Sequence, residues 1–170
     1  WQSNRRVRLS RSTSRIRQKS MKFRFVWVGR TKDNSFLDLQ KNYLRRLSHF
    51  VKCEIVEIRD AAGSNSKETE GKRILEKLNQ NTFVCLLDVA GRSLSSHDVA
   101  REIEKWQNSG LKEVSFVVGG ADGISAEVAS RADLMLSLSF LTFTHEMARV
   151  VMLEQLYRAY TIIRGFPYQK

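Results

Sequence analysis

Three short segments of the chain combine glycine and apolar residues in a way that suits ligand binding. The first contains Leu87 and ends at Gly91, the second is the turn 119–123, and the third is the run 138–143. Glycine lets a ligand approach the backbone closely and leaves its N–H and C=O groups accessible. The apolar side chains that would form a slot for a flat ring are Leu87, Leu138, Leu141 and Phe143. The three segments together predict a pocket, although each glycine taken alone is equally compatible with a tight turn.

The turn 119–123 matches no general nucleotide-binding motif. Val118 stands where the first glycine of a dinucleotide fingerprint would be, and no P-loop lysine follows the turn. The chain also lacks a G-x-S-x-G nucleophile elbow. Hydrolase and P-loop chemistry are therefore not expected.

Charged residues near the C-terminus are the next candidates for chemistry. Glu154 and Arg158 stand four positions apart, in the order that favours an ion pair along a helix, within an otherwise apolar stretch. A paired charge on so apolar a stretch suggests a function beyond the ion pair itself. His145 begins the same stretch beside the third segment, either as a pocket residue or as a polar residue of a first helical turn.

Histidine and cysteine give no sign of a metal site or a disulfide framework. His49, His97 and His145 share no metal-ligand spacing, so we expect no metal. Cys53 and Cys85 lie within apolar runs, which indicates buried and inert thiols. Two cysteines are too few for a disulfide scaffold.

Length and composition indicate one globular domain with a basic leader. The chain has 170 residues, of which 42% are hydrophobic and 28% charged, and a net charge of +11. Seven of the 29 Lys and Arg residues lie within 1–20, which holds no acid, so residues 21–170 carry only +4. A mildly basic body permits an anionic partner such as RNA. No apolar stretch approaches the roughly eighteen residues of a membrane span, so no membrane association is expected.

The leader, residues 1–20, is rich in Arg and Ser and poor in large apolar groups. Such a composition predicts disorder, because little surface can be buried to offset chain entropy. We interpret it as a segment that is not native to a protein starting at Met21, with an organelle transit peptide and an RNA-binding arm as alternatives. It lacks the apolar core of a secretory signal.

The positions of the three segments follow from the elements around them. Apolar runs predict strands over 23–28, 52–58, 82–88, 114–118 and 134–138, and helical spacing predicts helices over 34–49, 67–80, 96–108, 125–131 and 144–164. This alternation is typical of an α/β fold with a parallel sheet. In such sheets ligands bind at the carboxyl ends of the strands, where all three segments fall.

The last predicted helix is apolar around nearly its whole circumference. A helix of this kind is buried on more than one side. One side would pack on the sheet, and the second would contact the same helix of another subunit or lie within the core of its own domain. We favour a two-fold dimer.

Several longer runs resemble the bacterial RlmH family of SPOUT-class methyltransferases. They are KFRFVWVG at 22–29, FVVGGADGIS at 116–125, and LSLSFLTFTHEMARVVMLEQLYRAYTIIRGFPYQK at 136–170. The most specific parts are the GG-x-x-G turn, the segment 139–145 and the stretch 154–160. The similarity extends over essentially all of 21–170.

The resemblance implies an enzyme that uses S-adenosylmethionine to methylate N3 of a pseudouridine in helix 69 of 23S rRNA, on the ribosome and in the cytoplasm. It also implies a C-terminal trefoil knot and a homodimer. The cofactor-binding residues carried over by motif are Leu87, Gly119, Leu138, Ser139, Phe140, Leu141, Thr142 and Phe143.

The same resemblance indicates the catalytic residues. Arg158 would stabilise the anion that develops on the base, and Tyr168 in the C-terminal tail would help to dock the nucleotide. His145 and Glu154 would orient these groups. The family tail usually reads P-Y-H, whereas this chain has Gln169 in place of the histidine. Gln cannot accept a proton at neutral pH, so either the residue at this tail position only positions RNA or this protein is impaired, and we favour positioning.

Two other functions are compatible with the same fold. One is methylation of another RNA, such as tRNA. The other is a non-catalytic module that binds RNA or the ribosome.

Overall fold

The fold is described for residues 21–168 in a computed structural model. A single sheet of five parallel strands forms its centre, in the order β2-β1-β4-β3-β5. The strands are β1 Lys22–Val28, β2 Lys52–Ile58, β3 Phe83–Ser93, β4 Glu113–Val118 and β5 Leu134–Ser137. All five predicted strands and the α/β class are confirmed. The leader 1–20 and Gln169 lie outside the described residues.

Five helices connect the strands. They are α1 Asn34–Leu47, α2 Ser66–Lys77, α3 Ser96–Asn108, α4 Ala126–Arg131 and α5 His145–Arg164. The side chains of Asp33, Ser95, Ser125 and Thr144 accept backbone N–H groups at the first turns of α1, α3, α4 and α5. At the other end of α5, Gly165 has φ +66°, the left-handed conformation in which glycine commonly ends helices. The predicted helices are confirmed with boundaries that differ by up to three residues.

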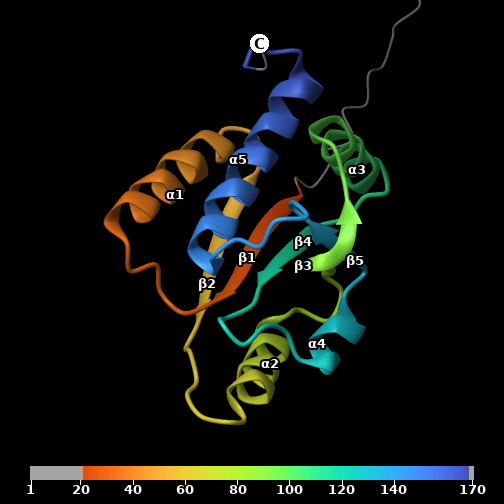
Figure 1. The fold of residues 1–170 in the computed structure, drawn as a ribbon. Helices are drawn as coiled ribbons and strands as arrows, with labels where there is room; N and C mark the ends of the chain where they lie inside the picture. Colours follow the sequence, from red (N-terminus) through yellow and green to blue (C-terminus); the bar gives the residue numbers. More distant parts are fainter. Residues whose placement is uncertain (1–20, 169–170) are drawn as a thin grey trace, which may run out of the picture.

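The helices cover both faces of the sheet, as Figure 1 shows. Alternate residues of β1 face opposite sides: Phe23, Phe25 and Trp27 pack with α1, α3 and α5, whereas Val26 and Val28 pack with α2 and α4. From Phe25 to Val28 the strand is buried on both faces, which explains why this part of its sequence is continuously apolar. The molecule is therefore a three-layer α/β/α fold.

Helix α5 lies on the sheet between α1 and α3 (Figure 1). These two helices supply apolar contacts on either side of it, so burial of α5 does not by itself require another subunit. Tyr160, for example, is 1% exposed and belongs to the core of the protomer. A half-buried stripe remains along one side of the helix, formed by Met147, Val151, Glu154, Arg158 and Ile162.

Strand β3 continues five residues beyond its predicted end because it pairs with β5 twice. Leu87 and Arg92 both lie opposite Leu136, so the residues between them bulge out of the ladder. After the bulge, β3 pairs with β5 again, and Gly91 makes this close approach possible. A Cβ at Gly91 would lie 2.6 Å from the Met135 carbonyl carbon and 2.7 Å from the Leu136 nitrogen. A run of apolar residues does not predict a bulge of this kind.

Candidate functional site

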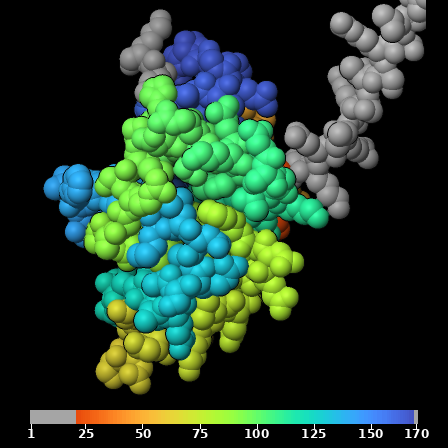
Figure 2. Space-filling view, turned by 90° about the vertical axis from the view of Figure 1, so that its right-hand side faces the viewer, coloured from red at the N-terminus to blue at the C-terminus, as the bar shows by residue number. Residues whose placement is uncertain are grey.

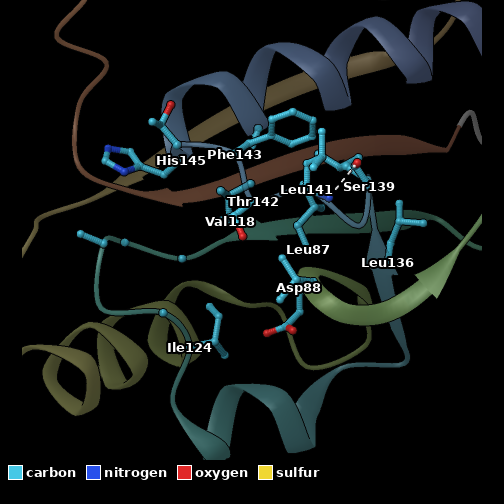
Figure 3. A pocket seen from close by; sticks show the side chains of 18 residues that line it. Leu87, Asp88, Val118, Ile124, Leu136, Ser139, Leu141, Thr142, Phe143 and His145 are labelled. Atoms are coloured by element: carbon cyan, nitrogen blue, oxygen red, sulfur yellow. Dashed lines mark hydrogen bonds between the residues drawn. The ribbon is translucent and has the colours of Figure 1, made fainter.

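A cavity of about 480 Å³ opens at the carboxyl ends of β3, β4 and β5 (Figure 3). Its lining residues come from the end of β3, the turn after β4, the segment after β5 and the start of α5. They are Leu87, Asp88, Val89, Val118, Gly119, Gly120, Ala121, Gly123, Ile124, Leu136, Leu138, Ser139, Leu141, Thr142, Phe143, Thr144, His145 and Ala148. The three segments singled out in the sequence therefore meet at one site.

The turn after β4 is narrow, and its glycines allow it to close. Gly123 donates its N–H to the Gly120 carbonyl at 3.2 Å and has φ +84°. A Cβ on Gly119 would lie 2.7 Å from Ile124 Cδ1 and 3.1 Å from the Gly123 carbonyl oxygen. A side chain at Gly119 would therefore displace Ile124 and press on the turn, which alters the wall of the cavity.

The segment after β5 is held by its own serines. The Ser137 hydroxyl donates to the Ser139 carbonyl at 2.9 Å, and Ser139 Oγ accepts the Leu141 N–H at 3.0 Å, the dashed line in Figure 3. This fold turns Leu141 and Phe143 toward the cavity (Figure 3). In the space-filling view, the light-green end of β3 and the blue residues near 140 lie next to each other (Figure 2).

Phe140 is the exception among the predicted cofactor-binding residues. Its side chain is 93% exposed and does not line the cavity. The other seven predicted residues all line it. Any contact from Phe140 to a ligand in the cavity would have to come from its backbone.

Sequence reasoning did not assign a role to several residues that line the cavity. Asp88 is the main polar one, and its carboxylate accepts the Ala90 N–H at 2.8 Å. An acid as the last residue of an otherwise apolar predicted strand was the signal that could have identified it. Val118, Ile124 and Leu136 complete the apolar walls, and nothing in their type distinguishes them from ordinary core residues.

His145 is the one predicted catalytic residue that lines the cavity. Burial lowers the pKa of its imidazole, and the positive charge of Arg149 lowers it further. The imidazole is therefore neutral at neutral pH and has a free ring nitrogen that can accept a hydrogen bond. Thr144, one residue earlier, caps α5 and fixes the position at which the helix presents His145.

The other three predicted catalytic residues form a cluster of their own. Arg158 donates to Glu154 Oε1 from Nε at 3.0 Å and from Nη2 at 2.6 Å. The Tyr168 hydroxyl donates to the same oxygen at 3.2 Å, and the Arg158 guanidinium carbon lies 4.9 Å from the Tyr168 ring centroid. Burial raises the pKa of Tyr168 above its ordinary value, and the hydrogen bond to Glu154 raises the pKa of Arg158. The tyrosine stays protonated and the arginine stays charged.

This cluster lies away from the cavity of the same protomer. Thirteen positions of α5 separate Arg158 from His145, which is about 20 Å along the axis at about 1.5 Å per residue. None of the cluster residues lines the cavity. The structure thus brings the predicted residues together as two groups rather than as one site.

The remaining titratable groups do not form a second centre. Burial raises the pKa of both Cys53 and Cys85 to about 12, so the thiols stay protonated. Both are free, and their prediction as buried thiols is confirmed for Cys85, whereas Cys53 is half-buried. Within residues 21–168, no three His, Cys, Asp or Glu side chains are grouped as a metal site. No helix in this range is long and apolar enough to cross a membrane.

A parallel α/β sheet with a glycine turn and a C-terminal segment enclosing a cavity defines the class of protein. The family model described as "Predicted SPOUT methyltransferase" matches residues 21–169, and the chain belongs to this family. The family assignment made from the sequence is confirmed.

Curated relatives narrow the comparison within the family. The chain is 41% identical over 156 residues to the ribosomal RNA large subunit methyltransferase H of Desulfotalea psychrophila, covering 88% of this chain and 100% of the relative. It is 38% identical over 159 residues to the protein of the same name from Halothermothrix orenii, with the same coverage. A crystal structure of a putative methylase family protein from Neisseria gonorrhoeae has the same fold, with a TM-score of 0.50 and 14% identity over 81% of this chain and 82% of that one.

SPOUT methyltransferases use S-adenosylmethionine, and the cavity fits that cofactor in size and chemistry. A volume of about 480 Å³ falls within the usual range for small-molecule sites, about 300–1,000 Å³. Leucine and isoleucine walls suit an adenine ring, the glycine turn exposes backbone groups, and Asp88 offers an acceptor for hydroxyl or ammonium groups. Leu87, Gly119 and the five cavity-lining residues of the segment 138–143 are the ones that would hold it.

Proposed function

We propose that this chain is a methyltransferase that modifies N3 of a pseudouridine in helix 69 of 23S rRNA, within the large ribosomal subunit. The observation that carries the proposal is identity of 36–41% with relatives named ribosomal RNA large subunit methyltransferase H, several of them matched over their whole length. The cavity at the sheet edge supports it, since a methyl donor needs a shaped site next to an accessible surface.

The cofactor supplies a sulfonium-bound methyl group that is already reactive toward a nucleophile. The protein must therefore provide position and electrostatics rather than a covalent intermediate. Residues 119–123 and 138–143 would bind the donor through backbone groups and apolar side chains. His145, neutral and at the cavity rim, would accept a hydrogen bond there and orient the incoming nucleotide.

Arg158 would act on the base. Methylation at N3 requires that nitrogen to lose its proton, and a nearby cation stabilises the negative charge that develops on the ring. Glu154 holds the guanidinium with two hydrogen bonds, and Tyr168 packs over it. These contacts hold the Arg158 side chain in one orientation, so it loses little conformational entropy when the base binds.

We also propose a two-fold dimer, because the cavity and the Arg158 cluster lie about 20 Å apart along one helix. Two α5 helices packed antiparallel through their half-buried stripes would bring Arg158 of the partner subunit toward the cavity of the first. Glu154, Arg158 and Val151 all belong to this stripe. The active site would then be shared between subunits.

A C-terminal trefoil knot is part of the same proposal. It is supported by the family and by the way the segment 138–144 lies against the turns after β3 and β4. In this arrangement the cofactor would bind where the chain passes between its own turns.

Mass spectrometry of 23S rRNA tests the function most directly. The gene would be expressed in a bacterial strain that lacks the helix 69 methyl group, and the nucleotides of helix 69 would be analysed. We expect the methyl group to return at N3 of one pseudouridine. A modified tRNA with unmodified 23S rRNA would instead indicate another substrate.

Calorimetry with S-adenosylmethionine tests the enzyme against a non-catalytic module. We expect a dissociation constant in the micromolar range or below. Absence of binding at millimolar donor would contradict the proposal.

A further inference from the structure

The loop between β1 and α1, residues 29–33, lies at the same sheet edge as the cavity. Strand β1 pairs with β4, with Trp27 opposite Val118, so the loop after β1 is the neighbour of the glycine turn after β4. A Cβ on Gly120 in that turn would lie 3.1 Å from Val28 Cγ1, immediately before the loop. The loop therefore continues the rim of the cavity by one strand.

The backbone of this loop is held by hydrogen bonds at three of its five residues. Gly29 donates its N–H to the Ile58 carbonyl at 2.7 Å. The Glu146 carboxylate, one residue after His145, accepts the N–H of Lys32 at 2.9 Å and that of Asp33 at 3.3 Å. Asp33 in turn caps α1. The start of α5 and the loop are thus joined as one unit.

Arg149 fastens the same loop from inside the protein. It is 0% exposed, and none of the ion pairs within residues 21–168 includes it. Its guanidinium donates to Thr31 Oγ1 at 2.9 Å and to the Val28 carbonyl, and its central carbon lies 5.1 Å from the Trp27 ring centroid. A buried cation that forms no direct ion pair is costly, and the charges of Glu146 and Glu57 only partly offset the effect of burial on the pKa of Arg149. The position that Arg149 imposes on the loop therefore suggests a function there.

Two cationic side chains project from this fixed backbone. The Arg30 side chain is 88% exposed, and its ion pair with Glu57 is long, at 3.6 Å between exposed groups, which makes it weak. Lys32 is exposed, and its charge contributes to the lowered pKa of His145 in the cavity. The loop therefore presents two positive charges on a rigid support beside the methyl-donor site.

We propose that residues 29–33 form a preformed site for the phosphate backbone of the RNA substrate, in which Arg30 and Lys32 contact phosphates and Arg149 and Glu146 act as positioning residues. This inference rests on the proposed function, since it requires an RNA to be bound next to the cavity. Phosphates attract cations independently of sequence and fix the orientation of a nucleic acid on a protein. Here they would set the register that brings one base to the donor.

Methylation of large ribosomal subunits that lack the modification tests this proposal. We expect Arg30→Gln and Lys32→Gln each to raise KM for the subunit about fivefold, with kcat and the S-adenosylmethionine dissociation constant within twofold of the original. The slope of log affinity against log salt should fall by about 0.7–0.9 for each phosphate that is no longer neutralised. Lys112→Gln is the matched control. Lys112 is exposed and lies immediately before β4, at the amino ends of the strands, whereas the cavity lies at their carboxyl ends.

The positioning role of Glu146 can be tested because the change in charge and the loss of its hydrogen bonds to the loop predict opposite changes in KM. Glu146→Ala makes the protein more positive, so a purely electrostatic effect would lower KM for the ribosomal subunit. Loss of the carboxylate that accepts the Lys32 and Asp33 N–H groups should instead raise KM at least threefold. A lowered KM for this variant would overturn the positioning role.

The phosphate site itself would be overturned by an Arg30→Gln, Lys32→Gln double variant with unchanged KM and salt slope. It would also be overturned if Lys112→Gln weakened binding equally, or if the double variant lost donor affinity. Failure of the proposed function looks different, because the unsubstituted protein would then leave the ribosomal subunit unmethylated.

Discussion

At the scale of single residues, the half-buried stripe of α5 carries a complete polar cluster. Arg158, Glu154 and Tyr168 satisfy one another through hydrogen bonds and a cation–π contact. Such a network fixes the guanidinium in one orientation without any contact to the cavity. The effects of Arg158 on donor binding and on catalysis can therefore be measured separately.

We predict that Arg158→Ala lowers kcat at least about a hundredfold, the scale seen when one electrostatic stabiliser of a transition state is removed. The dissociation constant of S-adenosylmethionine should stay within twofold, because no atom of Arg158 lines the cavity. Single-turnover methylation and calorimetry measure the two quantities. Arg101→Ala is a suitable control, since Arg101 forms an exposed ion pair with Asp98 on α3. A tenfold loss of donor affinity in Arg158→Ala would contradict this assignment.

Residue type and spacing predicted the Glu154–Arg158 pair, but they did not predict the burial of Arg149 or its contacts. Glu154 and Arg158 show a recognisable spacing. Glu146 stands three positions before Arg149, but that spacing indicates an exposed ion pair and not a buried arginine. Its partners are a backbone carbonyl, a hydroxyl and an indole ring more than 115 positions away in the chain. An arginine among apolar neighbours was the available signal, and it does not identify such partners.

At the scale of elements, the β3–β5 pairing determines one wall of the cavity. Residues 88–91 bulge out between two pairings to Leu136, and Gly91 packs directly on the backbone of β5. The contacting atoms are backbone, so they cannot move aside as the end of a flexible side chain could.

We predict that Gly91→Ala destabilises the protein by about 1–3 kcal/mol, as overpacking does, and weakens S-adenosylmethionine binding at least tenfold. The added methyl group must separate β3 from β5, which moves Leu87 and Leu136 in the cavity wall. Chemical denaturation and calorimetry provide the measurements. Ala90→Ser changes an exposed neighbour and should alter neither quantity. A Gly91→Ala protein with unchanged donor affinity would show that this wall does not shape the site.

The strands and helices were predictable because each depends on a local pattern. β1 reads as a buried strand because both of its faces are covered, and the α5 boundary is marked by Thr144 and Gly165. The order β2-β1-β4-β3-β5 and the bulge before Arg92 depend on contacts between distant segments, which periodicity does not encode. A knot is also a property of the whole path, so only the family resemblance indicated it.

At the scale of the whole molecule, the two groups of predicted site residues do not meet within one protomer. The cavity lies at one end of α5, and the Arg158 cluster lies near the other. A dimer through the half-buried stripe would join the cavity of one subunit to the cluster of the other. Because Tyr160 is in the core of the protomer, Val151 rather than Tyr160 is the position at which a charge would test this interface.

We predict that two inactive variants restore activity when their subunits are mixed. Arg158→Ala keeps an intact cavity, and Gly119→Val keeps an intact Arg158 cluster while its new side chain disrupts the glycine turn. In a mixed dimer, one of the two shared sites combines the intact cavity with the intact arginine. Random exchange makes half of the dimers mixed, so methylation should recover to about a quarter of the original rate if substitution does not bias association.

Action of Arg158 within its own subunit predicts a different result, because no mixed dimer would then contain a complete site and the mixture would stay inactive. Val151→Glu in both variants provides the control for the interface. An unpaired carboxylate buried between two α5 helices costs about 3 kcal/mol or more, which weakens association by about a hundredfold. Recovery should disappear with it, whereas Ile55→Glu, on the exposed side of edge strand β2, should leave recovery intact. Recovery that survives Val151→Glu would place the subunit contact elsewhere on the molecule.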